Sequence, residues 1–316
     1  MGKFILRRLG ISVIIVFLVS LFAFSLMHIL PGDPARLALG EEASEEDVQA
    51  LREELNLDKP LIMQYLLWIK GIFSGDMGYS IMYDRPVSEM LREKLPRTVS
   101  LGIPSLIISS VIGIVFGVLS AVKRGKVVDQ VITFFSTMGA GTPVFWIGII
   151  LMYLFGVKLR ILPISGWVSP SVNFGKFIRH AIMPVFCLSL QLTASISRQT
   201  RSNMLEVINQ DYIRTCRANG IKERSVVFRH ALRNTLIPII TIIALQIRRV
   251  IGGSLMVEQV FNIPGIGLMV KQGIMNRDYL VVQSSVLIIS LVTTVCNVFV
   301  DILYGFVNPQ IRKSWS

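Results

Sequence analysis

Two adjacent arginines, Arg248 and Arg249, interrupt the apolar segment from Thr235 to Val257. On an insertion scale an arginine near the membrane centre costs roughly 2.5–3.5 kcal/mol, whereas a Leu, Ile or Val favours insertion by about 0.3–0.6 kcal/mol. The 12 such residues of this segment supply about 4–7 kcal/mol against a cost of about 5–7 kcal/mol. An isolated helix of this sequence is therefore near break-even, and its arginines need other helices, an acidic partner or water around them.

Guanidinium groups in such a place could attract a carboxylate or another anion. Adjacent residues of a helix point about 100° apart, so Arg248 and Arg249 cannot face the same way. Gly252 and Gly253 lie one turn further along and leave space over the guanidinium groups. One interpretation is that at least one arginine lines a translocation path, with the glycines and Glu258 as further path candidates. The alternative is that the arginines pair with an acid such as Glu258 or extend towards the membrane surface.

Motifs for catalysis or metal binding are absent from the sequence. It contains no GxxxxGKS/T phosphate loop, no HExxH pair and no GxSxG nucleophile motif. The histidines and cysteines show no spacing typical of metal sites or disulfide frameworks: His28, His180, His230, Cys187, Cys216 and Cys296. We therefore expect a chain that is not an enzyme, binds no metal or cofactor, and cannot hydrolyse ATP through a phosphate loop.

A second group of polar residues forms a basic interval from Glu206 to Asn234, between two apolar segments. Glu206–Ala218 is predicted to form a short amphipathic helix, and Gly220 can end it in a left-handed conformation. The segment Ser225–Asn234 then restarts as helix. Such an elbow could fit a cleft in a partner protein; the alternative is a solvated basic segment without a partner.

The elements that must position these residues are membrane helices. The chain has 316 residues, is 52% hydrophobic and 16% charged, and has a mean hydropathy of +0.61, which is too apolar for an ordinary soluble domain. We therefore predict an all-α polytopic membrane protein with six transmembrane helices. Gly113 and Gly117 are four residues apart, as in closely packed helices. The predicted spans are 9–30, 99–122, 131–157, 181–197, 235–257 and 280–306.

The distribution of charge predicts the orientation of these spans. Sixteen basic residues lie at the amino terminus, in 123–126, in 198–233 and in 312–313, against six in 158–180 and 258–279. Because basic residues accumulate in cytoplasmic loops, both termini are predicted to be cytoplasmic. The net charge of +12 thus reflects topology and not a nucleic-acid surface.

Three domains are expected: a transmembrane helix at 1–30, an extracytoplasmic loop at 31–98, and a transmembrane core at 99–316 that includes the cytoplasmic segment of about 198–234. No A-x-A-type cleavage site follows the first helix, so it should be retained. The outer loop carries 13 acidic and eight basic residues. A helix is predicted there, capped by Ser44 and continued through Val48, Leu51 and Leu55.

Several motifs together resemble one family of transporters. The interval Glu206–Gly220 with Arg229–Asn234 resembles the coupling loop of ABC-importer permeases, in the version of the dipeptide, oligopeptide and nickel group. The other matching motifs are Leu30-Pro31-Gly32-Asp33-Pro34, Leu57–Leu61 with Gln64-Tyr65, Gly75–Gly78 with Ser80, Leu95–Thr98, Gly252-Gly253 with Val257-Glu258, Pro264–Gly267, and Arg277–Tyr279 with Val282-Gln283. Each motif is weak alone, but their order is specific.

The resemblance implies a B-type permease subunit of an ATP-driven importer in a bacterial or archaeal cytoplasmic membrane. Its partners would be a second, related permease, two ATPase subunits that bind ATP and Mg²⁺, and an external solute-binding protein. Five carboxyl-terminal helices would form the core, with the first helix outside it. The ATPase-coupling residues implied are Glu206, Asp211, Tyr212, Arg214, Thr215, Cys216, Arg217, Ala218 and Gly220, of which Arg214-Thr215-Cys216 replace the Glu-Ala-Ala of the wider superfamily.

The pair Arg248-Arg249 departs from the family, which usually has a small and an apolar residue there. The cargo therefore stays open between dipeptides, oligopeptides, nickel chelates, glutathione-type solutes or a more anionic solute. Two other classes also remain: a self-sufficient channel or secondary transporter, and a structural membrane subunit of an enzyme complex. Whether the outer loop contacts a binding protein also stays open.

Overall fold

The computed structural model describes residues 2–29, 33–40, 42–80 and 82–307, and these are mostly helical. Leu30-Pro31-Gly32 and the basic pair Arg312-Lys313 lie outside the described residues. The elements are α1 (Gly2–Ile29), α2 (Pro34–Leu39), α3 (Glu45–Glu54), α4 (Leu61–Ser74), β1 (Tyr79–Ser80), β2 (Arg85–Pro86), α5 (Val87–Val122), α6 (Val127–Gly141), α7 (Val144–Leu151), the π-helical η1 (Met152–Lys158), α8 (Phe174–Ile208), α9 (Asp211–Ala218), α10 (Glu223–Ser225), the π-helical η2 (Val226–Ala231), α11 (Leu232–Val260), α12 (Ile266–Met275) and α13 (Tyr279–Val307).

Five stretches of helix are long and apolar enough to cross a membrane, and a sixth is possible if α6 and α7–η1 count as one bent span. The five lie in α1, in α5, in α8, in α10 to α11 and in α13. This agrees with the predicted polytopic helical fold, with one change in the third span. That span is not straight but bends by 103°.

The bend follows from Pro143, because a proline disfavours the helical conformation of the residue before it. Thr142 is accordingly extended, with φ −88° and ψ 129°. The fourth span is also longer than predicted, since α8 extends well beyond 181–197 at both ends. Hydropathy detected only the most apolar part of this helix.

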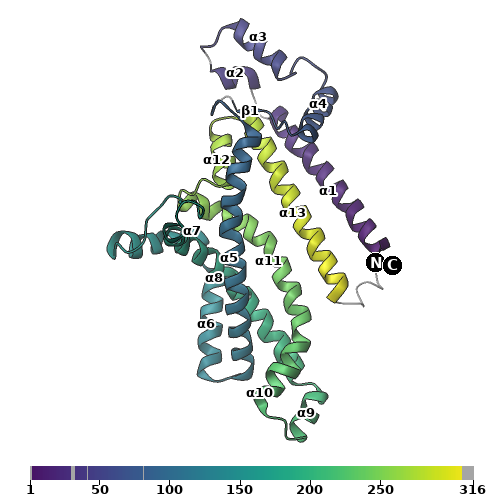
Figure 1. Ribbon diagram of the computed structural model, residues 1–316, viewed down its shortest axis with the longest axis vertical. Helices are drawn as coiled ribbons and strands as arrows, with labels where there is room; N and C mark the ends of the chain where they lie inside the picture. The colour runs from purple at the N-terminus through teal and green to yellow at the C-terminus, as the bar shows by residue number, and fades with distance from the viewer. Residues whose placement is uncertain (1, 30–32, 41, 81, 308–316) are drawn as a thin grey trace. The chain divides into compact units, whose positions relative to one another are not determined.

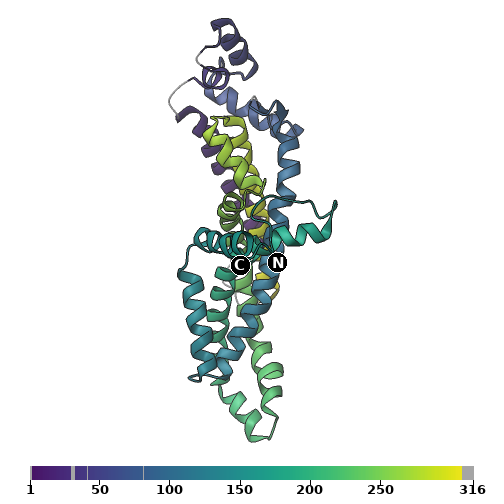
Figure 2. The same cartoon turned by 90° about the vertical axis from the view of Figure 1, so that its left-hand side faces the viewer.

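The chain divides into two compact units. Unit 1 contains Val99–Ile263 and unit 2 contains Ile5–Thr98 with Pro264–Val298. In unit 1, helices α5, α6 and α11 all pack on α8, and α9 with α10 lies at one end of this group (Figure 1; Figure 2).

Close contact between α5 and α8 depends on two glycines, as the sequence predicts. A Cβ atom at Gly113 would lie 2.8 Å from Cβ of Ile196, and one at Gly117 would lie 2.5 Å from Cβ of Thr200. Real Cβ atoms do not approach so closely. The two glycines therefore set the distance between these helices.

Unit 2 holds the outer segment. Ser44 caps α3 by accepting a hydrogen bond from the Asp47 amide (3.1 Å), and Val48 is fully buried, so the helix predicted there is confirmed. Asp278 accepts a hydrogen bond from the Ser80 hydroxyl (2.5 Å) and so ties β1 to the start of α13. The pKa of Asp278 is raised above its ordinary value because the carboxyl group is partly buried.

Candidate functional site

The interval after α8 forms an elbow, which we define as residues 209–231. The sequence predicted one helix over Glu206–Ala218, and this is wrong: α8 ends at Ile208 and α9 begins at Asp211. Gln210 is extended (φ −73°, ψ 152°), and its carbonyl accepts hydrogen bonds from the amides of Ile213 and Arg214. Asn209 and Asp211 favour this break, because an Asn and an acidic residue in the first turn suit helix ends better than helix interiors.

Gly220 makes the turn of the elbow. Its φ of 71° is the left-handed conformation that the sequence predicts. The Gly220 amide donates to the Arg217 carbonyl (3.0 Å), and the Ile221 amide donates to the Cys216 carbonyl (3.2 Å). A Cβ atom at Gly220 would meet nothing within 4 Å. Any other residue would therefore be disfavoured by backbone strain and not by collision.

The elbow is held by its own contacts. Ile213 is fully buried in an apolar cluster with Met204 and Val226. Arg217 donates two hydrogen bonds to Glu223 (2.8 and 3.1 Å), and this bond raises the pKa of Arg217 above its ordinary value. Helix α9 is thus fixed to α8, α10 and η2.

The opposite face of the elbow is open to solvent. Tyr212 is 37% exposed, and its hydroxyl accepts a hydrogen bond from the Asn234 amide group (2.7 Å). Cys216 is only half-buried. The other predicted coupling residues are exposed: Glu206, Asp211, Arg214, Thr215, Arg217, Ala218 and Gly220. Glu206 belongs to α8, whereas the others lie on α9 or in the turn after it.

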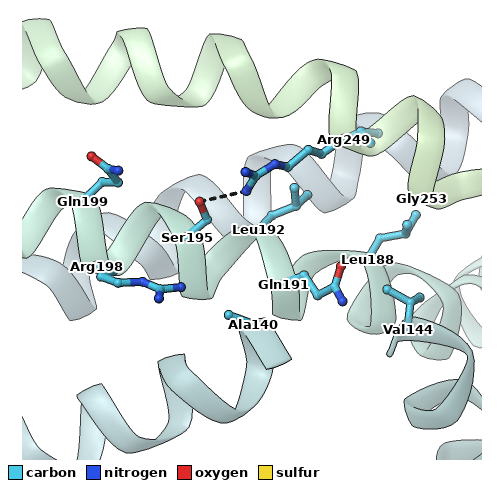
Figure 3. Close-up of a pocket in the computed structure, with 11 residues that line it drawn as sticks. Ala140, Val144, Leu188, Gln191, Leu192, Ser195, Arg198, Gln199, Arg249 and Gly253 are labelled. Atoms are coloured by element: carbon cyan, nitrogen blue, oxygen red, sulfur yellow. Dashed lines mark hydrogen bonds between the residues drawn. The ribbon is translucent and has the colours of Figure 1, made fainter. Parts of the chain in front are cut away.

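A second candidate site in unit 1 is a pocket of about 560 Å³ between α6, α7, α8 and α11 (Figure 3). We call it the arginine pocket. Its described lining consists of Ala140, Val144, Leu188, Gln191, Leu192, Ser195, Arg198, Gln199, Arg249, Val250 and Gly253. Among these residues there are two arginines, two amides and a hydroxyl, and no carboxylate.

Arg249 reaches from α11 to α8 (Figure 3). Its Nη1 donates to Ser195 Oγ (3.1 Å) and to Gln246 Oε1 (3.4 Å). Gln246 Nε2 also donates to Ser195 Oγ (3.1 Å). Neutral side chains therefore hold this guanidinium in place without neutralising its charge.

Only some of the predicted translocation-path residues line the arginine pocket. Arg249 and Gly253 line it, whereas Arg248, Gly252 and Glu258 do not. Arg248 and Gly252 are exposed elsewhere on α11, and Glu258 is fully buried.

Sequence reasoning missed the contribution of α8 to this pocket. The sequence places Arg198 among the basic residues of the cytoplasmic segment 198–234 and not in a cavity. The helical spacing of Gln191, Ser195, Arg198 and Gln199 on one face is the signal that could have identified them.

A further site that the sequence did not single out is an ion pair in the first turn of α6, of which the carboxylate is buried and the arginine is partly exposed. Arg201 on α8 donates to both carboxylate oxygens of Asp129 (2.8 and 2.9 Å). The same carboxylate accepts from the Ser120 hydroxyl on α5 and from the Gly125 amide (2.9 Å). The side chain of Asp129 is only 7% exposed. These four residues, which we call the brace, join α5, α6 and α8.

Two family models match the chain. Residues 113–313 match the binding-protein-dependent transport system inner membrane component, and residues 1–102 match the N-terminal part of such a membrane component. The first of these matches covers both the brace and the elbow.

Full-length relatives are similar over nearly the whole chain. An oligopeptide transport system permease protein, AppB of Bacillus subtilis, is 41% identical over 99% of this chain and 100% of its own. A probable peptide ABC transporter permease of Sinorhizobium fredii is 39% identical over 99% of this chain and 100% of its own. The dipeptide transport system permease protein DppB of Escherichia coli is 38% identical over 99% of both chains.

A solved structure has a similar fold. The methionine ABC transporter MetNI, in an inward-facing conformation, contains a chain that matches with a TM-score of 0.58 and 17% identity. The match covers 69% of this chain and 96% of that one. At this identity the likeness concerns the fold alone.

Proposed function

Because this chain belongs to the family of inner membrane components of binding-protein-dependent transport systems, we propose that it is the permease subunit of an ATP-driven importer of peptides. The observation that carries this proposal is the elbow: an exposed surface held rigid from within, on a chain whose sequence has no phosphate loop. Peptide cargo is supported by the relatives, which are named as oligopeptide, dipeptide and probable peptide permeases.

In this proposal the elbow transmits motion from an ATPase to the membrane helices. Ile213 packs with residues of α8 and η2, and η2 leads directly into α11, so a force on α9 reaches two long helices. An ATPase can shift the permease only if its nucleotide-bound and nucleotide-free states bind the elbow with different affinities. The residues nearest the contact are then those of the exposed face, Asp211, Tyr212 and Arg214 among them.

The proposed assembly contains a second, related permease, two ATPase subunits that bind ATP and Mg²⁺, and an external solute-binding protein. The elbow and both termini would face the cytoplasm, in agreement with the distribution of basic residues. Purifying the complex from native membranes and identifying its subunits tests this composition. A chain that transports without any ATPase would instead be a channel or a secondary transporter.

The sharpest test of the coupling role is Gly220→Val. A β-branched residue is strained at φ 71°, so the turn should change its shape while the membrane helices stay folded. In the purified complex we expect ATP hydrolysis to lose its stimulation by the loaded binding protein, and ATP-driven peptide uptake to fall by about tenfold or more.

Gly166→Val is the matched control for this test. Gly166 also has a positive φ (97°), and a Cβ atom added there would meet nothing within 4 Å, but this glycine lies in the loop before α8. The control should leave the stimulation unchanged. Wild-type stimulation in Gly220→Val would contradict the coupling assignment.

A further inference from the structure

We propose that the arginine pocket binds the side-chain carboxylate of an acidic peptide on its way through the permease, so that this path favours acidic over basic cargo. The inference rests on the proposed peptide-importer function and deepens it by naming a substrate class. Its basis is the unbalanced charge of the pocket, which α8 and α11 create together.

The charge imbalance appears when Arg198 is compared with Arg201, one turn further along α8. Arg201 has a carboxylate partner in Asp129. Arg198 has neither a hydrogen-bond nor an ion-pair partner in the described part of the chain, and it lines the pocket. Arg249, the second arginine of the pocket, contacts only the neutral Ser195 and Gln246. Two guanidinium groups therefore carry charge towards one cavity without an internal counterion.

The donors of the pocket suit a carboxylate. A guanidinium has five N–H donors, and the two described bonds of Arg249 use Nη1 alone, which leaves Nη2 and Nε for a ligand. Paired N–H groups match the two oxygens of a carboxylate better than any neutral group. Gln199 and Ser195 supply further polar contacts at the same wall.

The size of the pocket also suits a small peptide. Its volume of about 560 Å³ lies within the range of about 300–1,000 Å³ that is typical of sites for small ligands. Apolar residues complete the wall, including Leu188, Leu192 and Val250. They can contact the apolar parts of a peptide while the arginines hold its acidic group.

A role in membrane topology does not account for Arg249. Basic residues that orient a membrane protein lie in loops near the ends of its spans. Arg249 instead lies inside α11, with Val250 and Gly253 of the same pocket following it along the helix. Placing an arginine at such a position costs free energy unless the arginine pairs or lines a polar cavity, and Arg249 lines one.

The test uses the complete importer in proteoliposomes, with loaded binding protein in saturating amount. We would measure ATP-dependent uptake of Ala-Glu-Ala, of its neutral isostere Ala-Gln-Ala and of Ala-Lys-Ala. The wild type should take up the Glu peptide faster than the other two. Arg198→Gln and Arg249→Gln should each lower the Glu-to-Lys uptake ratio by about tenfold, the size expected for one charge-assisted hydrogen bond.

Arg248→Gln is the matched control, because it removes the same charge from the adjacent residue of α11, outside the pocket. It should keep the wild-type ratio. The binding protein is identical in every arm, so a change of ratio between variants reports the permease alone.

The outcomes separate the two proposals. If the wild type shows no ATP-dependent uptake of any of the three peptides, the proposed peptide-importer function fails. If uptake is ATP-dependent but both pocket variants keep the wild-type ratio, or Arg248→Gln lowers it equally, the carboxylate site is overturned and the importer function stands. Equal uptake of the Glu and Gln peptides by the wild type overturns the site without any variant, even if the variants do not assemble.

Discussion

Arg198 and Arg201 lie one turn apart on α8, and their surroundings differ in every respect that matters for charge. Arg201 belongs to the brace, where the Asp129 carboxylate accepts hydrogen bonds from two of its N–H groups. Arg198 faces the arginine pocket, whose described lining contains no carboxylate. Residue type alone therefore does not assign a role: a paired arginine joins helices, whereas one without a counterion is available to a ligand.

The largest expected effect comes from Arg201→Gln compared with Arg198→Gln. Loss of Arg201 leaves the 7% exposed Asp129 side chain without its counterion, and breaking such a pair lowers the free energy of unfolding by about 3 kcal/mol. The same substitution at Arg198 should change it by less than about 0.5 kcal/mol. The thermal unfolding midpoint of each purified variant in detergent checks this. Equal midpoints for the two variants would remove the distinction between brace and pocket.

A smaller effect is expected from Gly117→Val, which separates α5 from α8 beside the brace. The added Cβ would lie 2.5 Å from Cβ of Thr200, the residue before Arg201, and overpacking of this kind costs about 1–3 kcal/mol. Gly252→Val is the control, because a Cβ atom there meets nothing within 4 Å. We expect a lower unfolding midpoint for Gly117→Val only. A midpoint as high as that of the control would show that the helices can move apart at no cost.

The smallest effect concerns Asp278, a partly buried carboxylate whose described partners are the Ser80 hydroxyl and the Val281 amide. Because burial raises its pKa above the unfolded value, the folded state holds this proton more tightly. The stability gained from protonation is present at low pH and is lost as pH rises through the raised pKa. Asp278→Asn should therefore weaken the rise of the unfolding midpoint on acidification. An unchanged pH profile of the midpoint would show that this carboxylate does not contribute.

Local signals predicted much of the elbow. Gly220 was assigned its left-handed turn from its place after a short amphipathic stretch, and the structure has it there. The predicted extent of the helix was wrong, because hydrophobic periodicity does not register the break at Asn209 and Gln210, which the helix-end preferences of Asn209 and Asp211 favour. The coupling role of the exposed residues stays a prediction.

Hydropathy likewise predicted the membrane helices, since the apolar length needed to cross a bilayer is a property of each segment alone. Hydropathy did not predict the bend between α6 and α7, although Gly141 and Pro143 mark its position. The sequence also predicts the close packing at Gly113 and Gly117, because small residues four apart lie on one helix face.

The sequence is sufficient to predict the apolar spans, the turn at Gly220 and the presence of arginines within an apolar segment. Which arginine has a counterion depends instead on contacts between helices. Asp129 and Arg201 are 72 residues apart, and Ser195 and Arg249 are 54 apart, so no local pattern links them. The physical reason is that hydropathy and helical periodicity act within a segment, whereas the balance of charge in a cavity depends on which faces of α6, α8 and α11 meet.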